Sequence, residues 1–214
     1  MKIEVLKPMK YKNEANTTMN ICYTDIYDME ELDNRRLYIN NDIDNEIIDT
    51  IVYHILRFNR IDKDKKPEER KPILLYINSP WGGDVYSGYG LISAMQDSIT
   101  PIYTINQGMC ASMAFLIFLA GSKRYSMRNS TFLMHDGSNG AFIESASKLR
   151  DRIEYETGQL EQLTKKFVLE HTTIDDKFYD EKYRVEWYML PEEAKSHKIC
   201  DYIIGKDCTL DEII

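Results

Sequence analysis

The sequence has little cysteine, no long apolar run and no excess of basic residues. Only four of its 214 residues are cysteine, and none of them forms a C-x-x-C pair or a zinc-type spacing. We therefore expect reduced thiols, as in a cytoplasmic protein, and no metal site.

The lack of a long apolar run and of a basic segment argues against several classes of protein. The longest apolar run, residues 110–120, is too short to cross a bilayer and predicts a buried helix. No N-terminal segment joins a basic start, an apolar core and a small-residue cleavage site, so we expect no secretion signal. A net charge of −8 without a basic stripe argues against nucleic-acid binding. We expect neither membrane nor nucleic acid among the partners.

Apolar strands alternate with helical segments along the middle of the chain. Residues 73–77 are a continuous apolar strand, and a glycine turn, a helix and the strand 102–105 follow it as a βαβ unit. A strand over 35–40 and an amphipathic helix over 44–58 come earlier. The charged, proline-containing segment 59–72 is expected to be a solvated loop. The alternation predicts one α/β domain over residues 1–214.

The segments before and after these alternating strands and helices have a different character. Residues 1–22 are polar and without periodicity, which predicts a mobile N-terminal segment. A long helix is predicted from about 145 to 171, with a near-heptad stripe at Ala146, Leu149, Ile153, Leu160, Leu163 and Phe167. A narrow apolar stripe on a charged helix is typical of packing against another long helix. We therefore expect an oligomer contact there.

A serine lies at the predicted corner between a strand and the buried helix. Ser112 follows the small residues after strand 102–105, and His135 closes the next apolar strand, 131–134. A nucleophilic serine needs a base within reach, and this order of elements provides one, which predicts a hydrolase site. Cys110, two residues earlier, is an alternative nucleophile.

Short motifs along the chain resemble the proteolytic subunit of the Clp protease, ClpP, from about Tyr23 to Gly205. The matching pieces are Asp25-Ile-Tyr27, Tyr76-Ile-Asn-Ser-Pro80 with Gly82-Gly83, Gly108-Met-Cys-Ala-Ser-Met113, Leu133-Met-His135, and Glu193-Ala194 leading to Asp201. Each piece alone has little specificity. Their order and spacing together make the resemblance specific.

The resemblance implies a ClpP/crotonase-like α/β fold with a protruding long-helix handle at about residues 141–172. In that family two heptameric rings stack through their handles and enclose the active sites in a chamber. An ATP-driven unfoldase feeds the chamber. The expected partners are therefore other copies of this chain, an AAA+ unfoldase such as a Clp ATPase, and polypeptide substrates. No cofactor is expected in this chain, because the unfoldase uses the ATP.

Carried over by position, the resemblance implies that Ser112 is the nucleophile and His135 the general base. The family's third residue, an aspartate, falls on Glu186 here. A glutamate can orient the imidazole as an aspartate does, because the task is to accept the ring N–H and stabilise the imidazolium. Asp180 is the alternative acid.

The resemblance also implies an oxyanion hole made by the backbone N–H groups of Gly83 and Met113. Three departures accompany it: Trp81 is an extra residue before the glycine pair, Ala114 replaces a common glycine, and Asp136 begins a pair that replaces a polar-proline pair. We expect Trp81 to border the substrate groove.

Three functions remain open from the sequence. The first is an active, self-compartmentalised serine endopeptidase of the Clp type. The second is a catalytically silent ring subunit of the same family, and the third is a crotonase-type acyl-CoA enzyme with the same fold. The joint presence of Ser112 and His135 favours the first.

Overall fold

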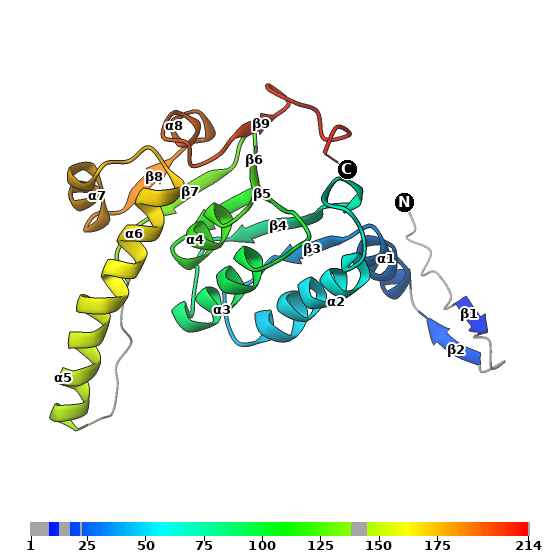
Figure 1. Cartoon of the computed structure of the whole chain (residues 1–214), viewed down its shortest axis with the longest axis horizontal. Coiled ribbons are helices and arrows are strands. Elements are labelled where there is room, and N and C mark those ends of the chain that lie inside the picture. The colour runs from blue at the N-terminus through cyan, green and yellow to red at the C-terminus, as the bar shows by residue number, and fades with distance from the viewer. Residues whose placement is uncertain (1–8, 13–17, 22, 138–144, 214) are drawn as a thin grey trace, which may run out of the picture.

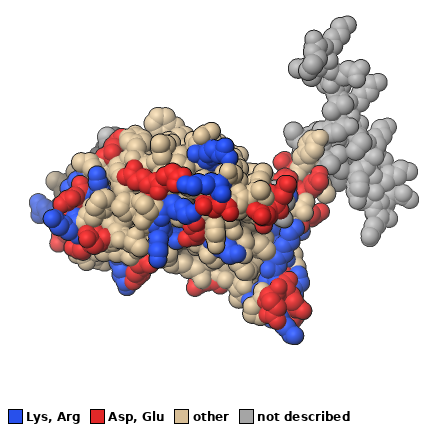
Figure 2. All heavy atoms as spheres, turned by 90° about the horizontal axis from the view of Figure 1, so that it is seen from above, with Lys and Arg blue, Asp and Glu red and all other residues tan. Residues whose placement is uncertain are grey.

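The computed structural model describes residues 9–12, 18–21, 23–137 and 145–213. It is an α/β structure in which helices cover a mainly parallel sheet, as Figure 1 shows. Among the described residues, we find no helix with the length and apolar character that a membrane span requires. Acidic and basic side chains are interspersed on the face shown in Figure 2.

The N-terminal part begins with a two-stranded hairpin. Strand β1 (Met9–Lys12) pairs antiparallel with β2 (Thr18–Ile21), inside the segment for which we predicted mobility. The remaining residues of that segment lie outside the described ranges. Helix α1 (Tyr23–Asp33) follows and leads into β3 (Arg36–Ile39), where we expected the first strand of the sheet.

A seven-stranded sheet organises the described residues. Its path runs β3-β4-β5-β6-β9, and all pairs along it are parallel. The strands are β4 (Ile73–Ser79), β5 (Ile102–Ala111), β6 (Lys123–Met127) and β9 (Tyr202–Ile204). The second half of β5 leaves β6 and pairs with β7 (Thr131–Met134), which in turn pairs antiparallel with β8 (Trp187–Met189). The branch carries the site described below.

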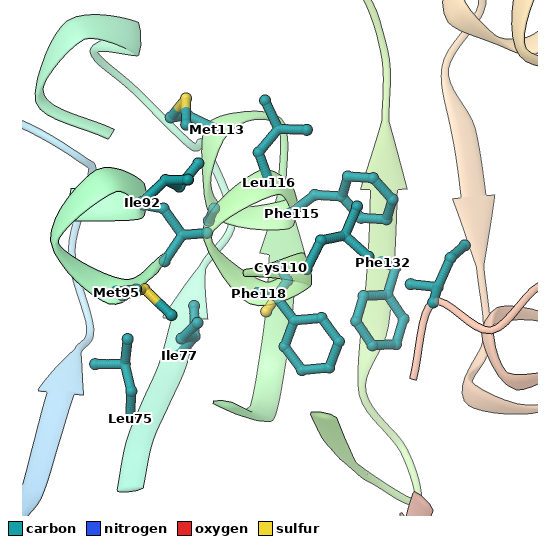
Figure 3. Close-up of a cluster of buried hydrophobic side chains, with 14 of the residues drawn as sticks. Leu75, Ile77, Ile92, Met95, Cys110, Met113, Phe115, Leu116, Phe118 and Phe132 are labelled. Carbon is teal, nitrogen blue, oxygen red and sulfur yellow. The ribbon is translucent and has the colours of Figure 1, made fainter. Parts of the chain in front are cut away.

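Helices cover one face of this sheet and enclose the core (Figure 1). They are η1 (Ile48–Val52), α2 (Tyr53–Asp62), α3 (Val85–Gln96) and α4 (Met113–Leu119), with the short turn η2 (Pro67–Glu69) after α2. Every residue of α4 is buried, as expected for a helix that is apolar all round. Figure 3 shows its side chains between those of β4, α3 and β7.

The predicted long helix is present as three consecutive segments. Helix α5 (Ala146–Tyr155) continues through a π turn, η3 (Glu156–Leu160), into α6 (Glu161–His171), and Figure 1 shows it extending away from the sheet. Phe167, near its end, is buried in the core, whereas Ile153 and Leu163 of the same stripe are 45% and 49% exposed. The outer part of the stripe is therefore uncovered in the single chain.

Helices α7 (Asp176–Tyr183) and α8 (Pro191–Ser196) complete the chain before β9. Pro191 lies in the first turn of α8, where its fixed φ suits the helix and its missing N–H costs nothing. The sequence had indicated neither α7 nor β6, because both consist mainly of polar and charged residues.

The prediction of a solvated loop over residues 59–72 was wrong at its start. Helix α2 runs to Asp62, whose side chain is fully buried. Arg35 donates to both carboxylate oxygens of Asp62, with 2.7 Å between Nη2 and Oδ1, and Thr100 and Lys65 add further contacts. The Arg35 hydrogen bonds hold the pKa of Asp62 well below its usual range. A carboxylate with this many partners can be buried although its neighbours are charged.

Asp62→Asn is expected to lower the free energy of unfolding by about 3–5 kcal/mol, because the buried Arg35 would keep its charge without a carboxylate to neutralise it. Since the folded pKa of Asp62 is depressed, its contribution is present above the unfolded pKa of about 3.8 and is lost as the pH falls below it. Urea unfolding at pH 7 and at about pH 2, below the unfolded pKa, measures both effects. Asp64→Asn, at an exposed position two residues later, is the control. Equal stability of the two variants would contradict the prediction.

Candidate active site

Ser112 lies at a strained corner between β5 and α4. Its backbone has φ 54° and ψ −120°, a left-handed conformation that costs a non-glycine residue about 1–3 kcal/mol. The corner is held from both sides: the Ser112 N–H donates to the carbonyl of Leu133 at 3.0 Å, and the Ser112 carbonyl accepts from Phe115 of α4 at 3.0 Å. This backbone conformation places the half-buried Ser112 at the start of a buried helix.

His135 and Glu186 lie opposite each other at the open end of the β7–β8 pair. The register joins Met134 to Trp187, so the next position brings His135 beside Glu186. Directly opposed residues on antiparallel strands have neighbouring side chains. The His135 Nδ1 atom is 3.9 Å from Glu186 Oε1, and the two side chains are 22% and 59% exposed. The pair is thus in contact but does not form a hydrogen bond.

The other acids near this end of the sheet have different partners. Asp180 contacts Lys165 at 2.7 Å, and Asp136 lies 3.9 Å from Arg184. Within the described ranges, Glu186 is the only carboxylate within 4 Å of a His135 ring nitrogen. Its second oxygen accepts a hydrogen bond from the Tyr188 hydroxyl at 2.7 Å. The geometry therefore favours Glu186 over Asp180 as the partner of the imidazole.

The glycine loop after β4 lies against the serine corner. A Cβ atom on Gly82 would meet the Ser112 Cβ atom at 2.6 Å and the Met113 nitrogen at 2.9 Å. A Cβ atom on Gly83, whose φ is 143°, would meet the carbonyl oxygen of Ile43 at 2.2 Å. Both positions therefore require glycine, and the loop can touch the start of α4 only because it lacks side chains there.

Two backbone N–H groups beside Ser112 have no partner in the described part of the chain. Those of Gly83 and Met113 donate no hydrogen bond to any described residue, whereas the neighbouring Asp84 N–H donates to Ile43. Met113 is the first residue of α4, where the helix cannot supply an acceptor and its dipole is positive. Unpaired donors at such a place suit an anionic oxygen.

Cys110 does not fit the role of nucleophile. Its side chain is fully buried in the core, and that burial raises the pKa of the thiol well above its usual value. A protonated thiol without solvent access is inert. Ala114, the departure from a common glycine, is also fully buried.

A cavity of about 530 Å³ joins these residues to the long helix. Ser112, Met113, His135 and Gly83 are among its lining residues, as is Trp81, which is 79% exposed. Glu186 does not line it. The opposite wall comes from the long helix and α7. The sequence had indicated only Leu160 among its residues, and had placed it in the stripe of the oligomer contact. The residues are Arg152, Glu156, Leu160, Thr164 and Val168 of the long helix, and Tyr179 and Tyr183 of α7.

No Ser112–His135 hydrogen bond is present in the described residues, although both side chains border the same cavity. Nor do these residues contain a group of three or more His, Cys, Asp or Glu side chains placed to hold a metal ion. The arrangement is thus a serine, an imidazole and unpaired backbone donors at one cavity. It has the parts that acyl transfer through a covalent intermediate needs.

Comparison with known proteins extends this result over most of the chain. The sequence model described as Clp protease matches residues 20–207. The ATP-dependent Clp protease proteolytic subunit of Bacteroides thetaiotaomicron is 28% identical over 194 residues, 88% of this chain and 82% of that protein. The ATP-dependent Clp protease proteolytic subunit 1 of Prochlorococcus marinus is 32% identical over 174 residues, 80% of this chain and 85% of that protein.

A solved structure shows the same fold. A ClpP1 point mutant from Listeria monocytogenes superposes with a TM-score of 0.70 at 21% identity, covering 88% of this chain and 99% of that one. The expected ClpP-like α/β fold is therefore confirmed. The family match spans the sheet, the Ser112 corner and the long helix together, and the chain belongs to the Clp protease family.

Proposed function

We propose that this chain is a serine endopeptidase in which Ser112 is the nucleophile, His135 the general base and Glu186 the residue that orients the imidazole. One observation carries the proposal. The strained Ser112, the His135 ring and the unpaired N–H groups of Gly83 and Met113 all border one cavity. A strained residue beside two N–H groups that no described residue pairs is more typical of a functional site than of a purely structural one.

In the proposed reaction His135 takes the Ser112 proton while Oγ attacks a peptide carbonyl carbon. The carbonyl electrons move to its oxygen, and the tetrahedral intermediate then expels the amine, which receives its proton from His135. Water, activated by the same imidazole, hydrolyses the acyl-enzyme and restores Ser112. This requires a Ser112–His135 hydrogen bond that substrate or assembly has to complete, as is common in enzymes without ligand.

Gly83 and Met113 would bind the oxygen that becomes negative. Their N–H groups carry no side-chain specificity, so they can serve any peptide bond. The positive end of α4 adds to the stabilisation at Met113. Each donor of this kind typically contributes about 100- to 1,000-fold to the rate.

We further propose that the chain acts as a ring subunit. The exposed outer stripe of the long helix, including Ile153 and Leu163, suits packing against the same helix of another copy. By analogy with the ATP-dependent proteolytic subunits it resembles, two stacked heptameric rings would enclose the sites, and an AAA+ ATPase would deliver unfolded polypeptides. In this scheme the chain itself needs no cofactor.

A catalytically silent ring subunit is the second candidate. The 3.9 Å gap between His135 and Glu186 and the absence of a Ser112–His135 hydrogen bond in the described residues favour it. An acyl-CoA enzyme would use the same backbone donors, but the similar proteins reported above are proteolytic subunits and give this third reading no support.

The two candidates are separated by a fluorophosphonate probe, which phosphonylates only an activated serine. We expect the assembled protein to be labelled on Ser112, as mapped by mass spectrometry of the adduct peptide, and labelling to disappear in His135→Ala. A His197→Ala variant, which removes the histidine that directly follows α8, is the control and should label normally. Assembled protein that takes up no probe would establish the silent subunit instead.

A further inference from the structure

The lining of this cavity combines apolar and polar residues. Phe115 and Leu116 of α4 and Leu160 and Val168 of the long helix provide apolar surface. Glu156, Glu161 and Tyr179 provide polar atoms along the same cavity. A site with this division suits a side chain that has a hydrocarbon stem and a polar head.

Two polar atoms of this lining are buried and have no partner. The Tyr179 side chain is 2% exposed, and its hydroxyl forms no hydrogen bond. The same holds for Oε2 of Glu156, although the Glu156 side chain as a whole is only partly buried. Burial raises the pKa of Tyr179, so its hydroxyl stays neutral and can donate or accept. Buried polar groups in native proteins normally have partners, so these two atoms indicate a ligand.

The charges around the cavity decide which ligand fits. Three carboxylates line it, and two are engaged: Asp84 accepts from the N–H of Ser87 at 2.7 Å, and Glu161 lies 3.3 Å from Arg184. Arg152 also lines the cavity and has an interaction of its own. Glu156 is the remaining carboxylate, and its buried oxygen lacks a donor. A cation with N–H groups supplies what is missing.

We propose that the part of the cavity around Glu156 and Tyr179 is a subsite for a lysine or arginine side chain next to the scissile bond. The inference rests on the proposed endopeptidase function. The methylene stem would lie between Leu160, Val168 and the α4 side chains, and the charged head would donate to Oε2 of Glu156 and to the Tyr179 hydroxyl. The π turn that contains Glu156 and Leu160 would then be part of the subsite, as π turns often are at functional sites.

The test uses two quenched fluorescent peptides that differ only in one residue, lysine or norleucine, which has almost the same stem and no charge. We expect kcat/KM to be about 10- to 100-fold higher for the lysine peptide. Glu156→Gln should bring this ratio close to one, and Tyr179→Phe, which removes only the hydroxyl, should reduce it several-fold. Mass spectrometry of the products identifies the side of the scissile bond on which the lysine lies.

Glu154→Gln is the matched control, because it removes the same charge from an exposed position two residues earlier and should keep the ratio. Equal cleavage of both peptides by the unmodified protein would overturn the subsite while leaving the proposed function intact. A ratio that survives Glu156→Gln would overturn it as well.

A binding measurement covers the case in which neither peptide is cleaved, which would count against the endopeptidase function. Fluorescence anisotropy of the same peptides, labelled and mixed with assembled Ser112→Ala protein, reports affinity without turnover. Tighter binding of the lysine peptide by about tenfold or more, lost in the double variant with Glu156→Gln, would support the subsite. Equal affinities would show that water alone satisfies the two atoms, and would overturn it.

Discussion

Replacement of Ser112 by alanine is expected to slow hydrolysis of a quenched peptide by roughly 10⁴- to 10⁶-fold. The hydroxyl is the only proposed group that forms a covalent bond to substrate. Without it no tetrahedral intermediate forms on the enzyme, and the oxyanion donors have no such intermediate to stabilise. The substitution removes one oxygen atom from a corner fixed by backbone hydrogen bonds to Leu133 and Phe115. The fold and assembly should therefore be preserved, as size-exclusion chromatography with light scattering would show.

Cys110→Ala is the matched control for this loss. It removes the sulfur of the alternative nucleophile from the buried side of the same strand, two residues before Ser112. We expect it to cost stability through a small cavity and to keep most of the turnover. If instead Cys110→Ala abolished hydrolysis and Ser112→Ala did not, the assignment of the nucleophile would be wrong.

Glu186→Gln is expected to reduce turnover by roughly 10³-fold while leaving assembly intact. Glutamine keeps the size of the side chain but no longer stabilises the imidazolium that forms when His135 takes the proton. Its position opposite His135 follows from the β7–β8 register, and neither strand should be disturbed by an exchange at an exposed end. Initial rates with one peptide, measured over a range of pH, give the size of the effect.

Asp180→Asn tests the competing acid under the same conditions. Its carboxylate contacts Lys165 on the surface of α6 and α7, so we expect a change in stability of about 1 kcal/mol or less and normal turnover. Normal turnover of Glu186→Gln together with a large loss in Asp180→Asn would reverse the assignment.

The order of strands and helices could be predicted where side-chain pattern and burial agree. Residues 73–77 and 131–134 are continuous apolar runs, and both became buried strands of the sheet. Strand β6 has the sequence Lys-Arg-Tyr-Ser-Met and lies in the sheet because β5 and β9 pair with it on either side. Tertiary pairing decided that strand, and no local pattern shows it.

Buried charge was the largest difference between expectation and structure. Asp62 lies in a segment rich in Lys, Asp and Glu, where solvent exposure is the ordinary expectation. Its burial depends on Arg35, which is 27 positions away in the chain and comes close only after β3 and α2 have packed. A contact of that kind cannot be inferred from a single sequence.

The residues of the candidate site likewise differ in whether the sequence indicated them. Ser112 and His135 each end or follow an apolar strand, so local pattern alone brought them to attention, and the family resemblance supplied Glu186. The long-helix residues of the opposite wall recur every fourth residue, a pattern whose meaning becomes clear only in the structure. They are Arg152, Glu156, Leu160, Thr164 and Val168. In a regular α-helix such a row drifts around the axis, by about 40° at each step. It can remain on one side here because the helix contains a wider turn.

Because of that π turn, a residue cannot be removed from the long helix there without rotating the part of the helix that precedes it. Loss of one residue between 156 and 160 would restore regular winding and swing all preceding residues by about 100° around the axis. Arg152 would leave the cavity wall, and Ile153 would move with it from its present place on the outer stripe. A one-residue deletion would therefore alter the substrate groove and the exposed tip together. Among variants of this chain, the cavity wall and the outer stripe of the long helix can exchange side chains independently. Their orientation around the helix axis can change only together.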